Sequence, residues 1–189
     1  MLDGQVALEL LAFLMNFENL VIARTVNGLP ALTNAGSSRY KGLETSVAWF
    51  LPSYVIGRAS YSFHDSRFVD YIYEFDPGVP TQLAGNQHEM SARHLASVGV
   101  LYNPPSGMTG GLELNYVGSR YMNMRNTAPT DGFATLRGII GYGHGKWSLQ
   151  LTGDNLTDQR PPSAESELGD AQYYLLPARR IDLTFGVRF

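Results

Sequence analysis

The sequence contains no cysteine among its 189 residues. Disulfide frameworks, cysteine-ligated zinc and thiol catalysis are therefore excluded. Charged side chains are also scarce, because Asp, Glu, Lys and Arg make up 16% of the chain, against about 25% in ordinary soluble domains. The formal net charge of −3 argues against a general nucleic-acid-binding protein, since such proteins carry a basic surface.

Long apolar runs are missing as well. The longest, Val6 to Met15, is interrupted by Glu9 and falls short of the roughly 18 to 20 residues that a transmembrane helix needs. The first residues, Met1 to Gly4, lack the basic region of a signal peptide. The sequence thus predicts neither a membrane-spanning helix nor a cleavable leader.

Glycine and aromatic residues are abundant instead, with 20 Gly, 11 Tyr and 9 Phe. The clearest pattern is an alternation of apolar and polar residues from Arg179 to Phe189. A strand projects successive side chains to opposite faces, so this segment is predicted to be a strand with one apolar and one polar face. The polar positions are Arg180, Asp182, Thr184, Gly186 and Arg188.

The same alternation recurs upstream and predicts about eight strands, many of them about ten residues long, which is the span that a tilted strand needs to cross a bilayer. The further segments are 41–51, 55–64, 96–102, 111–117, 134–142 and 147–152, with one more strand in 5–22. In 5–22 the alternation is poor, so a short helix there stays open.

The connections alternate in length. Short turns occupy 51–53, 103–107 and 143–146, whereas 23–38, 66–92, 121–132 and 157–177 are long and polar. Transmembrane barrels have short periplasmic turns and long extracellular loops. The fold predicted is therefore an all-β, antiparallel transmembrane β-barrel segment. Aromatic residues beside the short turns predict an interfacial girdle, with simple packing under the turns as the alternative: Trp49, Phe50, Tyr54, Tyr102, Tyr142, Trp147 and Phe189.

Several segments resemble the C-terminal β-barrel of TonB-dependent outer-membrane receptors. The segment from Asn34 to Glu44 is similar to that family's Asn-x-Gly loop followed by Gly-x-Glu at a strand start. The segment from Thr152 to Asp158 is similar to its penultimate-strand signature, with Thr157 in place of an aromatic residue. The segment from Tyr173 to Arg180 is similar to the lead into the final strand, which ends at the aromatic Phe189.

The resemblance implies that residues 1–189 form the C-terminal part of a receptor barrel, without the plug domain that fills such barrels. The missing leader agrees with a partial chain, since outer-membrane proteins are exported. The implied activity is TonB-dependent uptake of a scarce nutrient, typically a ferric siderophore, across the bacterial outer membrane. The implied partners are the lipid bilayer, the rest of the barrel and plug, TonB through that plug, the barrel assembly machinery and an extracellular small ligand, but no nucleic acid.

Three groups of residues are candidates for function. Loop 66–92 mixes aromatic and hydrogen-bonding groups, as ligand-contact loops do: Tyr71, Tyr73, Phe75, Asp76, Gln82, Asn86 and His88. Charges on polar faces are predicted to face the lumen, because Arg or Lys facing lipid costs roughly 2 to 4 kcal/mol, with mutual neutralisation as the alternative role: Arg58, Glu113, Arg137, Asp154, Arg180, Asp182 and Arg188. The resemblance implies a C-terminal assembly signal in the last strand: Ile181, Leu183, Phe185, Val187 and Phe189.

No catalytic constellation emerges. His64, Asp65 and Ser66 are adjacent, and adjacent strand residues point to opposite faces, so they cannot form a relay. His88, Glu89 and His94 lack the spacing of a metal-binding helix motif, which leaves a loop contact to a metal-bearing ligand open. We therefore expect neither an enzyme nor a resident cofactor.

Two other interpretations remain open. One is a complete eight-stranded outer-membrane barrel with a structural or adhesion role, since eight strands can close a small barrel. The other is a soluble β-barrel that binds a small ligand inside. An open sheet with two unpaired edges contradicts the first, and an apolar band on the outer surface contradicts the second.

Overall fold

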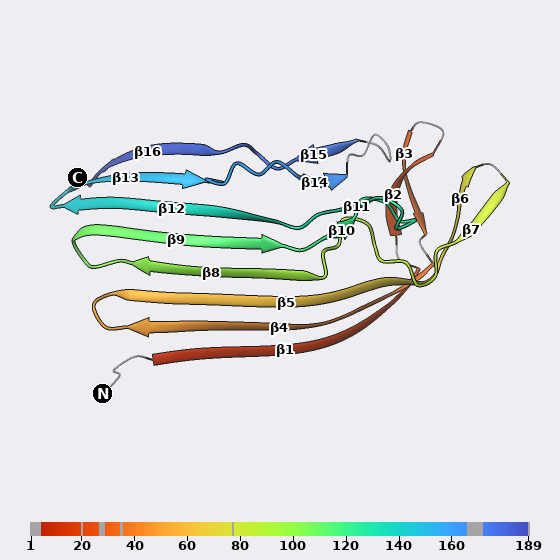
Figure 1. Cartoon of the computed structure of the whole chain (residues 1–189), viewed down its shortest axis with the longest axis horizontal. Helices are drawn as coiled ribbons and strands as arrows, with labels where there is room; N and C mark the ends of the chain where they lie inside the picture. Colours follow the sequence, from red (N-terminus) through yellow and green to blue (C-terminus); the bar gives the residue numbers. More distant parts are fainter. Residues whose placement is uncertain are drawn as a thin grey trace.

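The main body of the molecule is one antiparallel sheet of eight strands, shown in Figure 1. The structure is a computed structural model that describes residues 5–19, 21–26, 29–34, 36–76, 78–165 and 172–188. The strands are β1 (Gln5–Glu18), β4 (Ser37–Leu51), β5 (Val55–Asp70), β8 (His94–Tyr102), β9 (Gly107–Val117), β12 (Phe133–His144), β13 (Trp147–Asp154) and β16 (Arg180–Val187). They pair in chain order, which confirms the predicted all-β, eight-stranded architecture.

The segment with poor alternation is a strand. Residues Gln5–Glu18 pair with β4 along their whole length. Both faces of β1 are apolar here, because Leu8 and Leu10 alternate with Leu11 and Phe13, and this hides the period of two. The described residues contain no helix long and apolar enough to cross a membrane.

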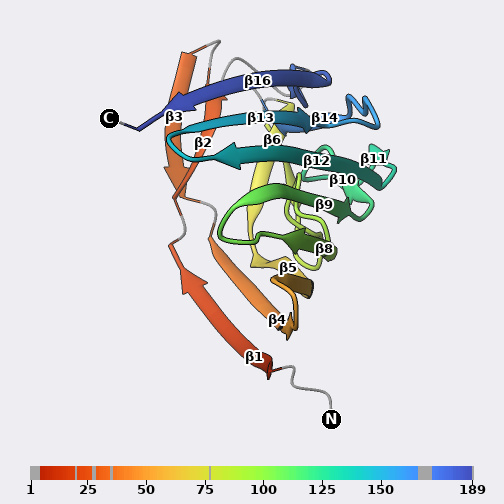
Figure 2. The same ribbon diagram turned by 90° about the vertical axis from the view of Figure 1, so that its left-hand side faces the viewer.

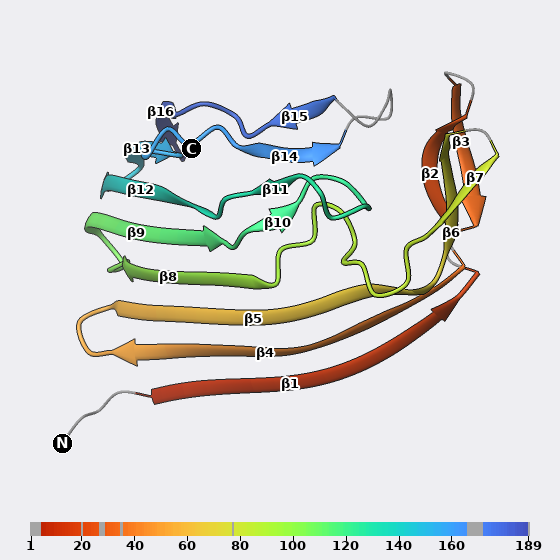
Figure 3. The same ribbon diagram turned by 45° about the vertical axis from the view of Figure 1, so that its right-hand side comes forward.

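The long connections carry hairpins of their own. These are β2 (Val21–Val26) with β3 (Leu29–Asn34), β6 (Ile72–Asp76) with β7 (Val79–Gln82), β10 (Arg120–Tyr121) with β11 (Pro129–Thr130), and β14 (Pro162–Glu165) with β15 (Tyr173–Leu175). All lie at one end of the sheet, opposite the short turns, and β2–β3 and β6–β7 stand out in Figure 3. The predicted loop 66–92 begins too early, since β5 continues through Ser66 to Asp70.

The sheet does not close. Strands β1 and β16 are its two edges, and no ladder joins them among the described residues. Figure 2 shows the eight strands as an open arc. This arrangement counts against a complete small barrel of eight strands.

The two faces of the sheet differ chemically, and neither covers a core. Leucines of the apolar face stay open, with Leu8 71% and Leu183 69% exposed. The only cluster of buried hydrophobic side chains in the described structure lies at the loop end and consists of Phe68, Tyr71 and Leu83. A single apolar layer of this size needs an apolar environment, because large exposed apolar surfaces mark contact with lipid or another protein.

The predicted aromatic girdle lies largely on the apolar face. Register places Trp49 opposite Gly57 and Tyr142 opposite Leu149, beside the short turns. The rings of Tyr142 and Trp147 are 5.6 Å apart. Phe50 points to the polar face, because it directly follows Trp49 in a strand.

Gly42 should be intolerant of substitution. A methyl group there would lie 2.4 Å from the backbone oxygen of Phe63 and 2.7 Å from the Phe13 ring. We expect Gly42→Ala to lower the free energy of unfolding by about 1 to 3 kcal/mol, as overpacking does, measured by thermal unfolding of the full-length protein in detergent. Gly57→Ala is the matched control, because the nearest atom lies 4.0 Å away. Equal stability of the two variants would contradict the β1–β4–β5 register.

Candidate functional site

A row of charged side chains crosses the polar face at one level of the sheet. Register aligns Arg58 with Gly99, Gly99 with Glu113, and Glu113 with Arg137. The row continues through an ion pair of 3.0 Å between Arg137 Nε and Asp154 Oδ1. Beyond it, Arg180 lies 3.3 Å from Asp154 and 2.7 Å from Asp182.

The predicted lumen-facing residues therefore share one face, and most of them lie in one row, whose part from Arg137 to Asp182 is joined by ion pairs. Arg188 lies just past β16, where its backbone N–H donates to the Lys146 carbonyl over 2.7 Å. The side chains of Arg137 and Arg180 are 57% and 70% exposed. Exposed pairs of this kind stabilise a fold by at most about 1 kcal/mol each. The row is better suited to hydrogen-bonding a polar partner than to holding the sheet together.

A second cluster gathers at the loop end, where aromatic rings form a continuous series. We call this the aromatic cluster, and its members are Tyr40, Phe68, Tyr71, Tyr73, Phe75 and His88. The closest ring pairs are Phe68–His88 at 4.1 Å and Tyr73–Phe75 at 4.5 Å. The guanidinium of Arg125 lies 3.7 Å from the centre of the Phe75 ring, a cation–π contact.

The predicted ligand-contact residues fall into buried and open sets. Tyr71 and His88 are buried, at 3% and 9% exposure. Tyr73, Phe75 and Asn86 are half-buried, whereas Asp76 and Gln82 are exposed. The open edge of the aromatic cluster is thus formed by the β6–β7 hairpin.

The polar residues of this loop also hold its shape. The Gln82 side-chain carbonyl accepts from the backbone N–H groups of Tyr71 and Ala84, and its amide donates to Asp70 over 3.0 Å. The Asn86 side chain donates to the Met124 carbonyl over 2.9 Å. Gln82 and Asn86 thereby order the backbone on which the aromatic rings are mounted.

Residues from the next long loop complete the cluster, and sequence reasoning missed them. Asn126 accepts from the Gln87 backbone N–H over 2.7 Å and donates back to the Gln87 carbonyl over 2.8 Å. Met124 packs against the buried core, and Arg125 covers Phe75. No pattern in 121–132 could have revealed this, because each partner lies far away along the chain.

His88 is held in its neutral form by burial. Its ring lies between Tyr40 and Phe68, and loss of water around it lowers the pKa of His88 to about 4. His94 lies apart from His88, on the apolar face, where its Nδ1 and the Tyr61 hydroxyl are 2.8 Å apart. No metal-binding group of three or more His, Cys, Asp or Glu side chains occurs within the described ranges.

The adjacent residues His64, Asp65 and Ser66 alternate between faces. His64 bonds to Glu44 over 2.8 Å and Ser66 to Ser91 over 2.8 Å, both on the polar face. Asp65 bonds to Arg67 on the opposite face. Their geometry is that of ordinary strand residues.

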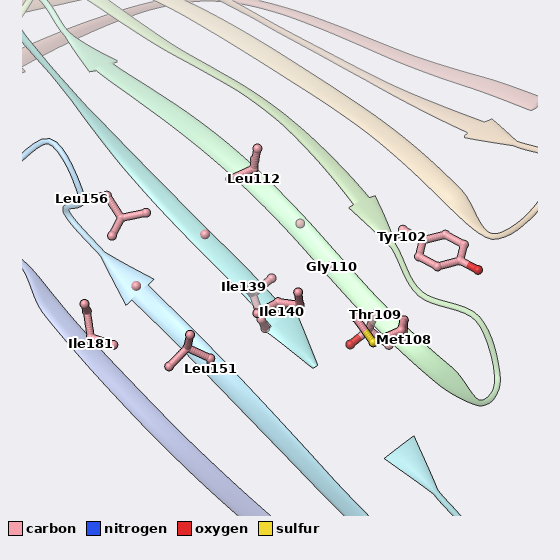
Figure 4. A pocket seen from close by; sticks show the side chains of 13 residues that line it. Tyr102, Met108, Thr109, Gly110, Leu112, Ile139, Ile140, Leu151, Leu156 and Ile181 are labelled. Carbon is pink, nitrogen blue, oxygen red and sulfur yellow. The ribbon is translucent and has the colours of Figure 1, made fainter. Parts of the chain in front are cut away.

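The apolar face is hollowed between β8 and β16, as Figure 4 shows. The hollow has a volume of about 510 Å³, and glycines form much of its floor. The Leu156 side chain folds over two of them, because a methyl group on Gly153 or Gly138 would meet it at 2.6 or 3.3 Å. Asn155 fixes this turn by donating to the carbonyls of Gln159 and Pro177, both over 2.8 Å.

The last strand presents its apolar side chains openly. Ile181, Leu183, Phe185 and Val187 alternate with the charged row and are 64%, 69%, 65% and 47% exposed. Phe189, the last member of the expected assembly signal, lies outside the described residues.

Comparison with models of known protein families gives a match over most of the chain. Residues 1–156 match the family model described as TonB dependent receptor-like, beta-barrel. No curated protein sequence matches this chain significantly.

Solved structures share the fold at low sequence identity. The siderophore receptor PiuA from Acinetobacter baumannii superposes with a TM-score of 0.77 at 19% identity, over 96% of this chain and 26% of that receptor. The ferric yersiniabactin uptake receptor FyuA from Yersinia pestis gives 0.75 at 20% identity, over 97% and 28%. The ferric citrate transporter FecA gives 0.75 at 21% identity, over 99% and 29%. This chain therefore spans between a quarter and a third of the length of these proteins.

Acid should loosen the aromatic cluster before the sheet. His88 takes up a proton at pH about 6.5 when unfolded but only at about 4 when folded. The contribution of neutral His88 to the free energy of unfolding is therefore complete above pH 6.5. It falls by up to about 3 kcal/mol as the pH drops to about 4. Tyrosine fluorescence or hydrogen exchange in residues 66–92 should report this loss, and His88→Gln should flatten it. His144→Gln, at an exposed strand end, controls for the loss of a histidine. An unaltered pH profile in His88→Gln would contradict the assignment.

Proposed function

This chain belongs to the TonB-dependent receptor β-barrel family, and from that premise we propose that it forms part of the membrane-spanning wall of an outer-membrane uptake receptor. Its apolar face contacts the lipid bilayer, and the charged row faces the lumen. The remaining strands and the plug come from outside this chain, and TonB acts through that plug.

The observation that carries this proposal is the single-layer sheet with two chemically distinct exposed faces. An apolar face suits lipid, and a charged face suits a wet lumen or a polar plug. The unpaired backbone edges of β1 and β16 suit continuation of the barrel, because open sheet edges are not tolerated in lipid.

We propose further that the loop end binds the transported ligand, a small iron chelate such as a ferric siderophore. Similar folds belong to receptors named for siderophores and ferric complexes. The β6–β7 hairpin supports this role, because its Tyr73 and Phe75 side chains are half-buried and the guanidinium of Arg125 lies over the Phe75 ring. A cationic group beside aromatic faces attracts anionic and aromatic chelates.

The apolar face of β16 serves, in this proposal, as the signal by which the barrel assembly machinery recognises its client. Four exposed apolar side chains at alternate positions form one continuous strip on the edge strand. An edge strand can pair with another strand through its free backbone groups. In the sequence, Phe189 follows Val187 in the same alternating pattern.

Uptake by the full-length receptor should depend on the β6–β7 hairpin. We expect the double variant Tyr73→Ala, Phe75→Ala to reduce the affinity for a labelled ferric chelate by about tenfold or more, since truncating an aromatic hot spot costs about 2 kcal/mol or more. Affinity is measured as binding of the labelled chelate to iron-starved cells. Uptake is measured in the same cells with and without TonB. Tyr54→Ala, an exposed aromatic residue at the opposite end of the sheet, is the control. TonB-independent uptake, or equal affinity in both variants, would contradict the proposal.

Assembly of the full-length receptor should depend on the strip of β16. Phe185→Asp, or Phe189→Ala, is expected to reduce the amount of receptor that is inserted and folded in the outer membrane, because each removes an apolar group from the alternating C-terminal sequence. Folded receptor is quantified by its resistance to unfolding in cold detergent on gels. Thr184→Asn, on the polar face of the same strand, is the control. Unchanged insertion of both strip variants would refute the assembly role.

A further inference from the structure

Four basic side chains gather on the apolar face at the loop end of β4, β5 and β8. We call them the rim cluster: Arg39, Lys41, Arg67 and Arg93. Register pairs Lys41 with Asp65 and Arg39 with Arg67. The β4 and β5 positions alternate with the polar-face residues Tyr40 and Ser66, so their side chains share the face of Leu43 and Phe63. Arg93 lies just before β8 and joins them through its contact with Asp65.

A single buried carboxylate lies at the centre of the rim cluster. Asp65 is 11% exposed and lies 2.9 Å from Arg67 Nε, 3.5 Å from Lys41 Nζ and 3.6 Å from Arg93 Nη2. Arg39 donates instead to the neutral Asn16 side chain over 2.8 Å. Three of the four cations thus share one carboxylate, and Arg39 has only a neutral partner.

The neighbouring acidic groups do not cancel this charge. Register pairs Ser37 with both Glu18 and Asp70, which are the nearest other carboxylates on this face. Glu44 lies on the opposite face, bonded to His64. Counting Asp65, Glu18 and Asp70 against the four cations leaves a local charge of about +1, in a chain whose net charge is −3. Neutralising Asp65 needs only one of these cations.

The basic groups remain open to a further anion. The side chains of Lys41, Arg67 and Arg93 are 54%, 40% and 39% exposed. Arginine and lysine bind phosphate well, arginine through two parallel hydrogen bonds. The surface therefore has the charge, the donors and the accessibility that a phosphate group requires.

The position of the rim cluster on the sheet indicates which kind of molecule it binds. The next residues on the same face are Leu43 and Phe63, one step along the strands, followed by the rest of the apolar face. If that face contacts lipid, as in the proposed function on which this inference rests, the rim cluster stands at the level of the headgroups, on the loop side. We propose that the rim cluster binds the anionic phosphate headgroup of a membrane lipid, whose acyl chains lie along the apolar face below. A transported ligand is not the partner, because the lumen is on the other face.

The experiment compares anionic and zwitterionic lipid on the full-length protein. The protein is reconstituted in mixed vesicles of phosphatidylglycerol and phosphatidylcholine, and the lipids it retains on extraction are counted by native mass spectrometry. The wild type should retain phosphatidylglycerol preferentially. Each of Lys41→Gln, Arg67→Gln and Arg93→Gln should lower the preference about fivefold, because a basic residue at an anionic surface contributes about 1 kcal/mol.

Two further variants make the result specific. Asp65→Asn should raise the preference, because it removes the competing internal carboxylate, and it tests the site even where a cation variant fails to fold. Lys146→Gln, which removes a cation at the short-turn end, should leave the preference unchanged. Equal loss in Lys146→Gln would show that overall charge is responsible and would overturn the site.

The remaining outcomes separate this inference from the proposed function. A wild type that inserts into vesicles but retains both lipids equally would overturn the rim cluster alone. A wild type that inserts into neither vesicle would overturn the proposed membrane function, and the lipid site with it. Displacement of phosphatidylglycerol by inorganic phosphate at equal concentration would assign the site to free phosphate and overturn a lipid partner.

Discussion

The alternation of side chains along each strand is the constraint on which the structure depends. Eight strands form one layer, and in the described part of the chain no second sheet or helix covers it, so each strand presents an apolar and a polar face to two different environments. Backbone hydrogen bonds hold the sheet, whereas the apolar side chains that normally stabilise a fold stay exposed, as Leu8 and Leu183 do. These side chains contribute little to stability unless an apolar environment covers them, and in the proposed function that environment is the bilayer.

Each face then acquires a distinct role from its chemistry. The polar face carries a row in which positive and negative charges nearly cancel, since Asp154 pairs with Arg137 and Arg180. This face is therefore hydrophilic without a large net charge. The apolar face is interrupted by charge at the loop end, where Asp65 draws three cations together. One face thus carries a balanced row of charges, whereas the other is apolar with a basic cluster at the loop end.

The loop end is the one part of the described structure with a conventional hydrophobic core. Phe68, Tyr71 and Leu83 pack there because β5 extends beyond β8, and residues 85–88 bond to it in place of a strand. Long loops that are supported in this way can present side chains at fixed positions. The buried, neutral His88 belongs to this support, while the half-buried Tyr73 and Phe75 form the open edge.

The sequence by itself determined the all-β class, the positions of most strands and the shared face of charged residues such as Arg58, Glu113 and Arg137, because alternation is a local property that can be counted. It left β1 ambiguous, since Leu8 and Phe13 make both of its faces apolar. Only the tertiary structure decided that the sheet stays open, that Asn126 ties one long loop to Gln87 in another, and that Arg93 joins Lys41 around Asp65. Those contacts join residues that are far apart in the chain, and their formation depends on register and loop packing, which no local pattern records.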